Sequence, residues 1–231
     1  MNSLGGFFMV QRFSLQAEIY DVIEQFKATK VMQTGAQRYN VSPTQHVTIV
    51  MNDRHEQRVL QDARWGLFPY WARDAVNTTK QAVRGKSFLY ELVMRNRCVV
   101  PCTGFYGAKQ FGLERDPRAM HIVLPGKPLF GVAGIFDRFR NGQGEEIRVF
   151  TMLTSETTGT MASWQPSLPI VLDEEGVEAW LDPKARNYDL LQMHLPHLES
   201  YMLRSYPVTN AVYDDQYESP DCIRELGIDF A

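Results

Sequence analysis

The sequence predicts a single α+β domain built around a curved, largely antiparallel β-sheet. Many short strand-like runs are interspersed with a few helices, and the regular strand–helix alternation of a doubly wound sheet is missing. The 231 residues, 44% of them hydrophobic, suffice for a sizeable core. No linker, low-complexity run or internal repeat divides the chain, so we expect one domain over residues 1–231.

The N-terminal half is predicted to contain two helices and a hairpin. Apolar residues recur on one face of the first helix, and Ser14 can cap its start. Asn52 and Asp53 are turn residues between two runs rich in β-branched and apolar residues. The expected elements are a helix over 14–27, strands over 46–51 and 58–65, and a helix over 87–96 capped by Ser87.

The C-terminal half is predicted to be strand-rich, with helices at its end. Asn141-Gly142 separates the last two strand-like runs and is a strong hairpin signal. Asp173 caps a helix that continues to Leu181, and Ser219-Pro220 opens a last short helix. The expected strands cover 97–101, 103–108, 119–124, 128–136 and 147–154.

Composition predicts a soluble cytoplasmic protein. The formal net charge of -3 gives no global attraction to nucleic acid, so any polyanion site must be a local patch. Three cysteines do not suggest a disulfide framework. No apolar run approaches the roughly 18–20 residues that span a membrane, and the first residues lack the basic flank of a signal peptide.

Several short motifs stand in a fixed order along the chain. They are RYNVSP (38–43), WGLFPYW (65–71), Asn77, RCVVPCTGFY (97–106), GVAGIF (131–136), PIVL (169–172) and PVT (207–209). In this order they resemble the SRAP family, the "SOS response-associated peptidase" proteins that process abasic sites in single-stranded DNA. The resemblance covers about residues 9–223, with residues 1–8 as an extra N-terminal segment. It implies a distorted β-barrel flanked by helices and a groove for single-stranded DNA.

The departures from the family pattern concern its chemistry. The family's nucleophilic cysteine, whose thiol and α-amine trap the aldehyde of an abasic sugar, falls on Val10 inside this chain. Its glutamate falls on Gly107 and its histidine on Gln165, which does not titrate near neutral pH. Only Asn77 is retained among the family's active-site positions. General acid–base catalysis typically contributes ~10²–10⁴-fold and is lost with this pair. We therefore expect a pseudoenzyme.

The resemblance also carries positions that line the DNA groove. Aromatic rings there can stack on bases and basic groups can contact phosphate, but each residue also has an ordinary structural interpretation as core, turn or solvated charge. A basic cluster at Lys80, Arg84, Lys86, Arg95 and Arg97 is either a solvated helix face or a rim facing a polyanion. The candidate DNA-binding residues are Arg12, Asn40, Pro43, Phe68, Tyr70, Trp71, Arg73, Thr79, Arg84 and Lys86.

Cysteine and histidine residues give no indication of a cofactor or metal. A zinc site from Cys98, Cys102, His194 and His197 is disfavoured, because the spacing is atypical and a proline separates the histidines. The cysteines are better interpreted as buried apolar residues, and His121 as a structural histidine with satisfied hydrogen bonds.

Three hypotheses follow from these observations. The first is a degenerate SRAP protein that keeps the fold and a weakened groove for single-stranded or damaged DNA. The second is a non-enzymatic interaction protein whose groove binds a protein or small ligand. The third is a residual enzyme with relocated thiol chemistry, for example at Cys102. Residues 4–9 could fill the pocket that the lost catalytic groups vacate.

Overall fold

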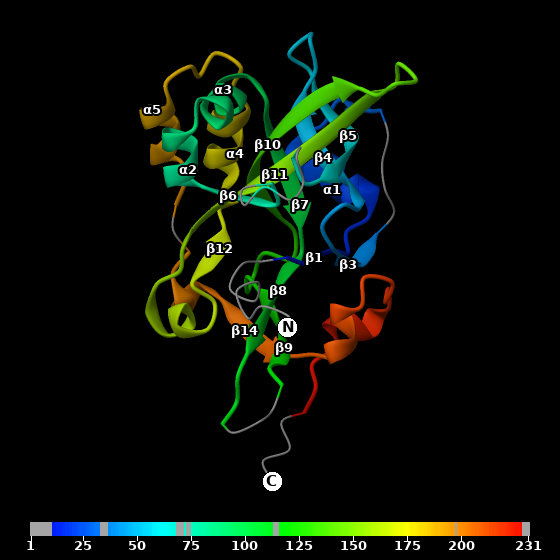
Figure 1. Cartoon of the computed structure of the whole chain (residues 1–231), viewed down its shortest axis with the longest axis vertical. Helices are drawn as coiled ribbons and strands as arrows, with labels where there is room; N and C mark the ends of the chain where they lie inside the picture. Colours follow the sequence, from blue (N-terminus) through cyan, green and yellow to red (C-terminus); the bar gives the residue numbers. More distant parts are fainter. Residues whose placement is uncertain are drawn as a thin grey trace.

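The computed structural model describes residues 11–32, 37–67, 72, 75–112, 116–196 and 198–227, and within these the strands form two sheets (Figure 1). The larger sheet has the order β12-β11-β10-β7-β4-β5-β2, and a parallel pairing of β11 with β5 closes part of it into a barrel. Its strands are β2 (Lys30–Val31), β4 (His46–Asn52), β5 (Arg58–Trp65), β6 (Asn77–Thr79), β7 (Arg97–Cys102), β10 (Phe130–Arg140), β11 (Glu146–Glu156), β12 (Ser167–Pro169) and β13 (Val171–Leu172).

The smaller sheet is antiparallel and has the order β14-β9-β8-β1-β3. A single residue, Thr103, connects β7 of the larger sheet to β8 of the smaller sheet. The two sheets therefore diverge immediately beside the GFYG run. The strands are β1 (Phe13–Leu15), β3 (Arg38–Val41), β8 (Gly104–Lys109), β9 (Arg118–Val123) and β14 (Arg204–Pro207).

The larger sheet is bifurcated between β10 and β11. These strands pair from their hairpin as far as Gly134 and Met152, and then separate. Residues 167–172 enter the gap, with β12 on β11 and β13 on β10. Ile170 bonds both sides, because its N–H donates to the Leu153 carbonyl and its carbonyl accepts from Ala133. The predicted α+β fold with a distorted, largely antiparallel barrel is confirmed.

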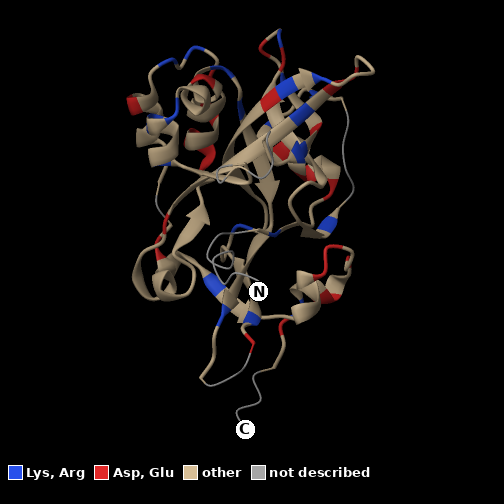
Figure 2. Cartoon of the chain, viewed as in Figure 1, with Lys and Arg blue, Asp and Glu red and all other residues tan. Residues whose placement is uncertain are grey.

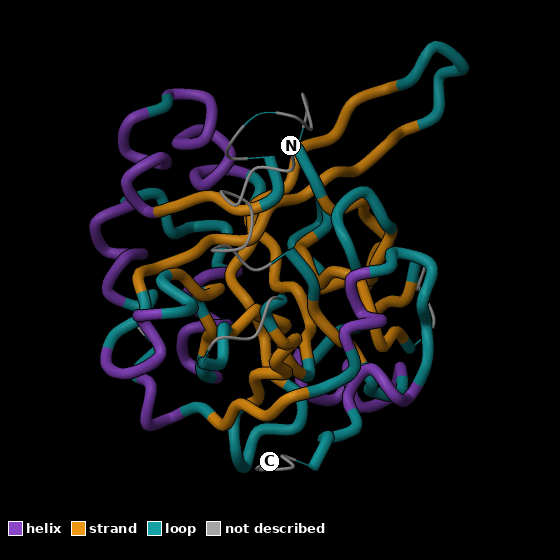
Figure 3. The backbone as a smooth tube through the Cα atoms, turned by 60° about the horizontal axis from the view of Figure 1, so that its bottom comes forward, coloured by secondary structure: helices purple, strands orange, loops and turns teal. Residues whose placement is uncertain are grey.

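Helices lie at the periphery of the strands (Figure 3). Asp173 caps α4 by accepting from the Gly176 N–H, as predicted, and the buried side of α4 places Trp180 in the core beneath it. None of the helices in the described part of the chain has the length and apolar character to cross a bilayer. The helices are α1 (Ile19–Phe26), α2 (Lys80–Gly85), α3 (Ser87–Arg95), α4 (Glu174–Leu181) and α5 (Tyr188–Met193), with 3-10 turns η2 (Gly159–Ser163), η3 (Ser200–Met202), η4 (Asn210–Tyr213) and η5 (Pro220–Ile223).

The predicted start of the first helix is wrong. Ser14 lies in β1 rather than at a helix N-cap, and α1 begins only at Ile19 with Glu18 as its N-cap. Phe13 pairs with Phe105 of β8 and Val41 of β3, so tertiary pairing overrides the helical pattern. Ser87 is likewise the first helical residue of α3 rather than its cap, and α2 was not predicted.

Trp65 belongs to the core. It is fully buried, contacts Phe13 edge-on with ring centroids 5.1 Å apart, and stacks on Phe150 at 6.4 Å. Its indole N–H donates to the Val76 carbonyl. Of the WGLFPYW run, Trp65 therefore builds the barrel interior, as its size and burial favour.

Candidate functional site

The positions of the lost glutamate and histidine meet in space. Gly107 lies on β8, whereas Gln165 precedes β12, yet a Cβ atom built on Gly107 would lie only 2.6 Å from Gln165 Oε1. Trp164 approaches the same point, with its Cζ3 3.1 Å from that Cβ. A larger residue at position 107 would therefore require the Gln165 side chain to shift and would lie tighter than usual against Trp164.

Gln165 is fixed in this position and fully buried. Its Nε2 donates to the Ser167 carbonyl at 2.8 Å, and its backbone N–H donates to the Met161 carbonyl. Within the described residues, Oε1 has no hydrogen-bond donor. The side chain thus presents a carbonyl oxygen toward the Gly107 backbone, where a carboxylate and an imidazole would be needed for proton transfer.

Asn77, the retained family position, lies on the short strand β6 beside β11. It begins β6, is 2% exposed, and pairs in parallel with Met152 of β11. Thr154 of β11 pairs with both Thr79 and Pro169, so β6 and β12 flank opposite edges of β11. Thr79 ends β6 and caps α2, because its side chain accepts from the Ala82 N–H at 3.1 Å. Its hydroxyl therefore has a structural role.

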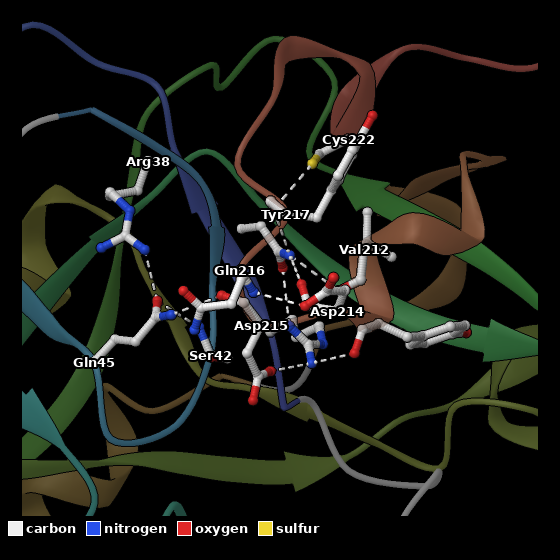
Figure 4. A network of polar contacts seen from close by, with 12 residues as sticks. Arg38, Ser42, Gln45, Val212, Asp214, Asp215, Gln216, Tyr217 and Cys222 are labelled. Carbon is white, nitrogen blue, oxygen red and sulfur yellow. Dashed lines mark hydrogen bonds and ion pairs between the residues drawn. The ribbon is translucent and has the colours of Figure 1, made fainter.

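Arg12 and Asn40 hold the C-terminal segment 212–217, which is the network drawn in Figure 4. Asn40 is 1% exposed, and its Nδ2 donates to the carbonyls of Val212, Asp214 and Tyr217 at 3.0, 3.1 and 2.9 Å. Arg12 donates to Asn40 Oδ1 at 3.2 Å and pairs with the Asp215 carboxylate. Both predicted groove residues are therefore engaged within the protein.

Arg38 and Gln45 extend these contacts with the C-terminal segment, and we call the four side chains of Arg12, Arg38, Asn40 and Gln45 the clamp. Arg38 Nε lies 2.8 Å from the Glu218 carboxylate and its Nη2 donates to Gln45 Oε1 at 2.7 Å. Gln45 Nε2 in turn donates to the Asp215 carbonyl at 3.1 Å, and Figure 4 shows these side chains converging on the loop. The C-terminal segment thus covers the free edge of β3, the last strand of the smaller sheet.

The remaining candidate groove residues are placed unevenly. Pro43 is half-buried in the turn between β3 and β4, and Lys86 is exposed at the start of α3. Arg84 is exposed but pairs with Asp189 at 2.7 Å and donates to Gln192. Val10, Phe68, Tyr70, Trp71 and Arg73, together with residues 4–9, lie outside the described residues.

The predicted basic cluster does not form one surface. Arg97 is buried and donates to the carbonyls of Val93, Trp180 and Asp182, so its interpretation as a surface charge is wrong. Burial, followed by the neighbouring Arg186 cation, lowers its pKa to about 10. Lys80 donates to the Leu195 carbonyl at 2.6 Å, and burial lowers its pKa. The cause in both cases is the loss of water around the charge.

His121 is the centre of a buried chain of hydrogen bonds that crosses the smaller sheet. Its Nε2 lies 3.1 Å from Ser14 Oγ and its Nδ1 2.9 Å from the Tyr206 hydroxyl. The ring packs against the Gly104 backbone, where a Cβ would lie 2.7 Å from Cε1. The prediction of a structural histidine is confirmed. Burial lowers its pKa to about 4, so the imidazole is neutral near pH 7.

The thiols are not placed for nucleophilic or metal chemistry. Cys98, Cys102 and Cys222 are free and buried, and burial raises the pKa of each. Within the described ranges, no group of three or more His, Cys, Asp and Glu side chains is placed to hold a metal ion.

A bifurcated antiparallel barrel, with the Gly107 and Gln165 positions facing each other where its two sheets diverge, defines an SRAP-type architecture. The family model described as "SOS response associated peptidase (SRAP)" matches residues 9–214. The chain therefore belongs to the SRAP family.

Relatives agree with this assignment, and solved structures share the fold. The chain is 29% identical over 226 residues to the abasic site processing protein YoqW of Bacillus subtilis, covering 93% of this chain and 99% of that protein. It is 27% identical over 226 residues to the abasic site processing protein HMCES of Xenopus tropicalis, covering 81% and 66%. A crystal structure from Bacteroides thetaiotaomicron shares the fold with a TM-score of 0.77 at 21% identity, covering 93% and 99% of the two chains. One from Bordetella bronchiseptica gives 0.71 at 16%, covering 86% and 99%.

Two features of the site could not be read from the sequence motifs. The Lys109 ammonium lies 5.5 Å from the centroid of the Trp164 ring, which comes from a separate segment. The amide of Asn40 donates to carbonyls 172 to 177 residues later in the chain. The one available signal was the placement of Lys109 two residues after Gly107, which puts both on one face of a strand.

Proposed function

We propose that this protein binds single-stranded DNA that carries abasic or other damage, and that it does so without forming a covalent bond to the DNA. Membership of the SRAP family and the abasic-site names of its relatives support the ligand. The proposed loss of the crosslinking chemistry rests on one observation, which is that residues without a nucleophilic or titratable group stand at the three family positions, Val10, Gly107 and Gln165.

Gly107 and Gln165 offer no proton-transfer group, and their contact leaves little space for one. A side chain at position 107 would require the amide of Gln165 to move and would lie tightly against the ring of Trp164. The glutamine cannot exchange a proton near neutral pH, and Val10 offers no nucleophilic atom. Of the residues at the three family positions, none therefore has a side chain that can attack an aldehyde or transfer a proton near neutral pH.

The thiol hypothesis finds no support in the environment of the cysteines. A thiolate is the reactive form of cysteine, and reactive cysteines lie in accessible, electropositive surroundings. Cys102 is fully buried, and burial raises its pKa well above the ordinary value. It would have to be uncovered and ionised before it could react.

Two measurements on one oligonucleotide test the proposal. The protein is mixed with a fluorescent single strand that contains one abasic site, and binding is followed by anisotropy at two salt concentrations. We expect binding that weakens steeply with salt, since phosphate contacts release counterions. Denaturing electrophoresis of the same mixture should show no shifted band, while a peptide with an N-terminal cysteine, as a positive control, should react.

Each outcome discriminates between the hypotheses. A shifted band of ordinary yield would overturn the pseudoenzyme proposal, and loss of that band in Cys102→Ala would assign it to the relocated thiol. Absence of any binding at low salt would contradict DNA as the ligand and favour a repurposed interaction protein.

A further inference from the structure

A cavity of about 640 Å³ lies at one end of the barrel, where β4 ends, β5 and β7 begin, and the β10–β11 hairpin extends outward. Its lining comes from β4, β5, β10, β11 and the two residues before β7, so several strands enclose it. The mouths of β-barrels are frequent ligand sites, and cavities of roughly 300–1,000 Å³ hold small organic ligands. We call this cavity the barrel mouth; its walls include Met51, Gln61, Arg95, Phe136, Arg138 and Arg148.

The barrel mouth is separate from the contact between Gly107 and Gln165. Asn96 precedes β7 and lines the barrel mouth, whereas Gly107 lies on β8, beyond the far end of β7. The six residues of β7 alone span about 20 Å. In Figure 1 the β10–β11 hairpin reaches the upper end of the molecule, and β8 lies in its lower half. A ligand in the barrel mouth would therefore not touch the position of the lost catalytic groups.

One buried amide lines the barrel mouth without a partner. Gln61 lies on β5, is 8% exposed, and makes no side-chain hydrogen bond with any other described residue. Its neighbours in the wall, Met51, Val59 and Phe136, are buried and apolar. A buried polar group without a hydrogen bond costs free energy. Since the amide has both donors and an acceptor, a ligand in the cavity can supply the missing partners.

The rim of the barrel mouth is cationic. Five Lys and Arg side chains and two acidic ones line the cavity, whereas the chain as a whole has a net charge of -3. Arg138 and Arg148 face each other directly on β10 and β11. Arg148 pairs with Glu146, yet its Nε is buried with no hydrogen-bond partner. Within the described residues, neither Arg95 nor Arg138 pairs with a carboxylate. Figure 2 shows basic segments on the hairpins at this end of the molecule, with acidic segments among them.

These features indicate the chemistry of a ligand. Guanidinium groups donate paired hydrogen bonds to phosphate oxygens, and three of them in one cavity favour an anion with more than one charge. The apolar wall and its single unpaired amide suit a flat ring with polar atoms at its edge. A nucleoside monophosphate combines these two parts in one small molecule.

We propose that the barrel mouth binds a free nucleoside monophosphate, with its base against Phe136 and the Gln61 amide. Its phosphate is held by Arg95, Arg138 and Arg148. The inference goes beyond the proposed function, because it names a second ligand at a separate place and stands whether or not the protein binds DNA.

Isothermal titration calorimetry with AMP, GMP, CMP and UMP tests the proposal, with each nucleoside and inorganic phosphate as reference ligands. At least one nucleotide should bind with one-to-one stoichiometry and roughly tenfold or more tightly than its nucleoside or phosphate. Arg138→Gln should weaken that binding roughly tenfold. The matched control is Arg140→Gln, at an exposed residue on the same face of β10 but outside the cavity, and it should bind like the wild type. Gln61→Met should weaken binding of the nucleotide without changing binding of inorganic phosphate.

The outcomes separate the barrel mouth from the DNA proposal. If none of the four nucleotides binds at millimolar concentration, the barrel mouth is overturned while DNA binding is unaffected. Phosphate that binds as tightly as every nucleotide, or equal losses in Arg138→Gln and Arg140→Gln, would also overturn it. If Arg138→Gln weakens binding of the abasic strand as much as that of the nucleotide, the ligand is the strand and a free nucleotide is wrong. Circular dichroism and thermal unfolding establish that each variant is folded.

Discussion

Acidification is expected to destabilise the fold through His121. The imidazole is buried at the centre of the smaller sheet, between Ser14 of β1 and Tyr206 of β14, and stacks at a tilt on Tyr106 with centroids 4.8 Å apart. Its ring contacts two hydroxyls and the rings of Tyr106 and Tyr206. Protonation would place a charge in surroundings that cannot compensate it, and burial therefore lowers its pKa.

The magnitude follows from the difference between the folded and unfolded states. The pKa of His121 is about 4 when folded against an ordinary value of 6.5. Between these values the unfolded chain binds a proton that the folded chain does not, so the free energy of unfolding falls as pH falls. The contribution is fully present above pH 6.5 and lost by about pH 4. At ~1.4 kcal/mol per pH unit, the loss is about 3 kcal/mol.

Urea unfolding at several pH values between 7.5 and 4 measures this loss. His121→Gln keeps hydrogen-bonding groups but does not titrate, so its free energy of unfolding should fall less over this range by about 3 kcal/mol. His55→Gln, at an exposed position, is the matched control and should follow the wild type. If wild type and His121→Gln lose stability in parallel between pH 6.5 and 4, the assignment of the buried neutral imidazole is refuted.

Three further predictions concern single side chains. Gly107→Ala should lower the free energy of unfolding, measured in urea, by ~1–3 kcal/mol, because the added methyl group overpacks against Gln165. The control Gly142→Ala meets open space and should change this free energy by less than ~1 kcal/mol. Equal effects of the two substitutions would contradict the contact. Asn40→Ala removes three hydrogen bonds to the C-terminal loop and should lower the free energy of unfolding by ~2–4 kcal/mol. It should also speed proteolysis within residues 212–217, and an unchanged cleavage rate would argue against the clamp. Thr79→Ala should cost ~1 kcal/mol by loss of the α2 cap, and Ser87→Ala, at an exposed residue that caps nothing, should be nearly neutral by thermal unfolding.

The longer strands, β4, β5 and β7 to β11, were predictable from the sequence because their signals are local, whereas the short strands of two to four residues were not predicted. The hairpin at Asn141-Gly142 and the strands around it follow from alternation and turn chemistry within a short window. The start of the first helix was not predictable in this way. Ser14 suits an N-cap by its chemistry, but Phe13 pairs with β3 and β8, which lie far along the chain. Long-range pairing decided the local structure there.

The replacements at the family's catalytic positions were also visible in the sequence, whereas the contact between two of them was not. Gly107 and Gln165 are 58 positions apart, and nothing in either segment indicates that the glutamine amide points at the glycine backbone. Asn40 illustrates the opposite case. The family resemblance suggested a groove contact for Asn40, but it lies in β3 and its amide donates to carbonyls 172 to 177 residues later in the chain.

The contact at Gly107 couples two of the family positions that are replaced in this chain. A larger residue at position 107 would need volume that Gln165 and Trp164 occupy, and Gln165 is held there by the Ser167 carbonyl. Glutamate at position 107 alone would therefore overpack the site, and histidine at position 165 alone would face a glycine. Restoring either group in a stable fold thus requires both segments, β8 and the turn before β12, to change together.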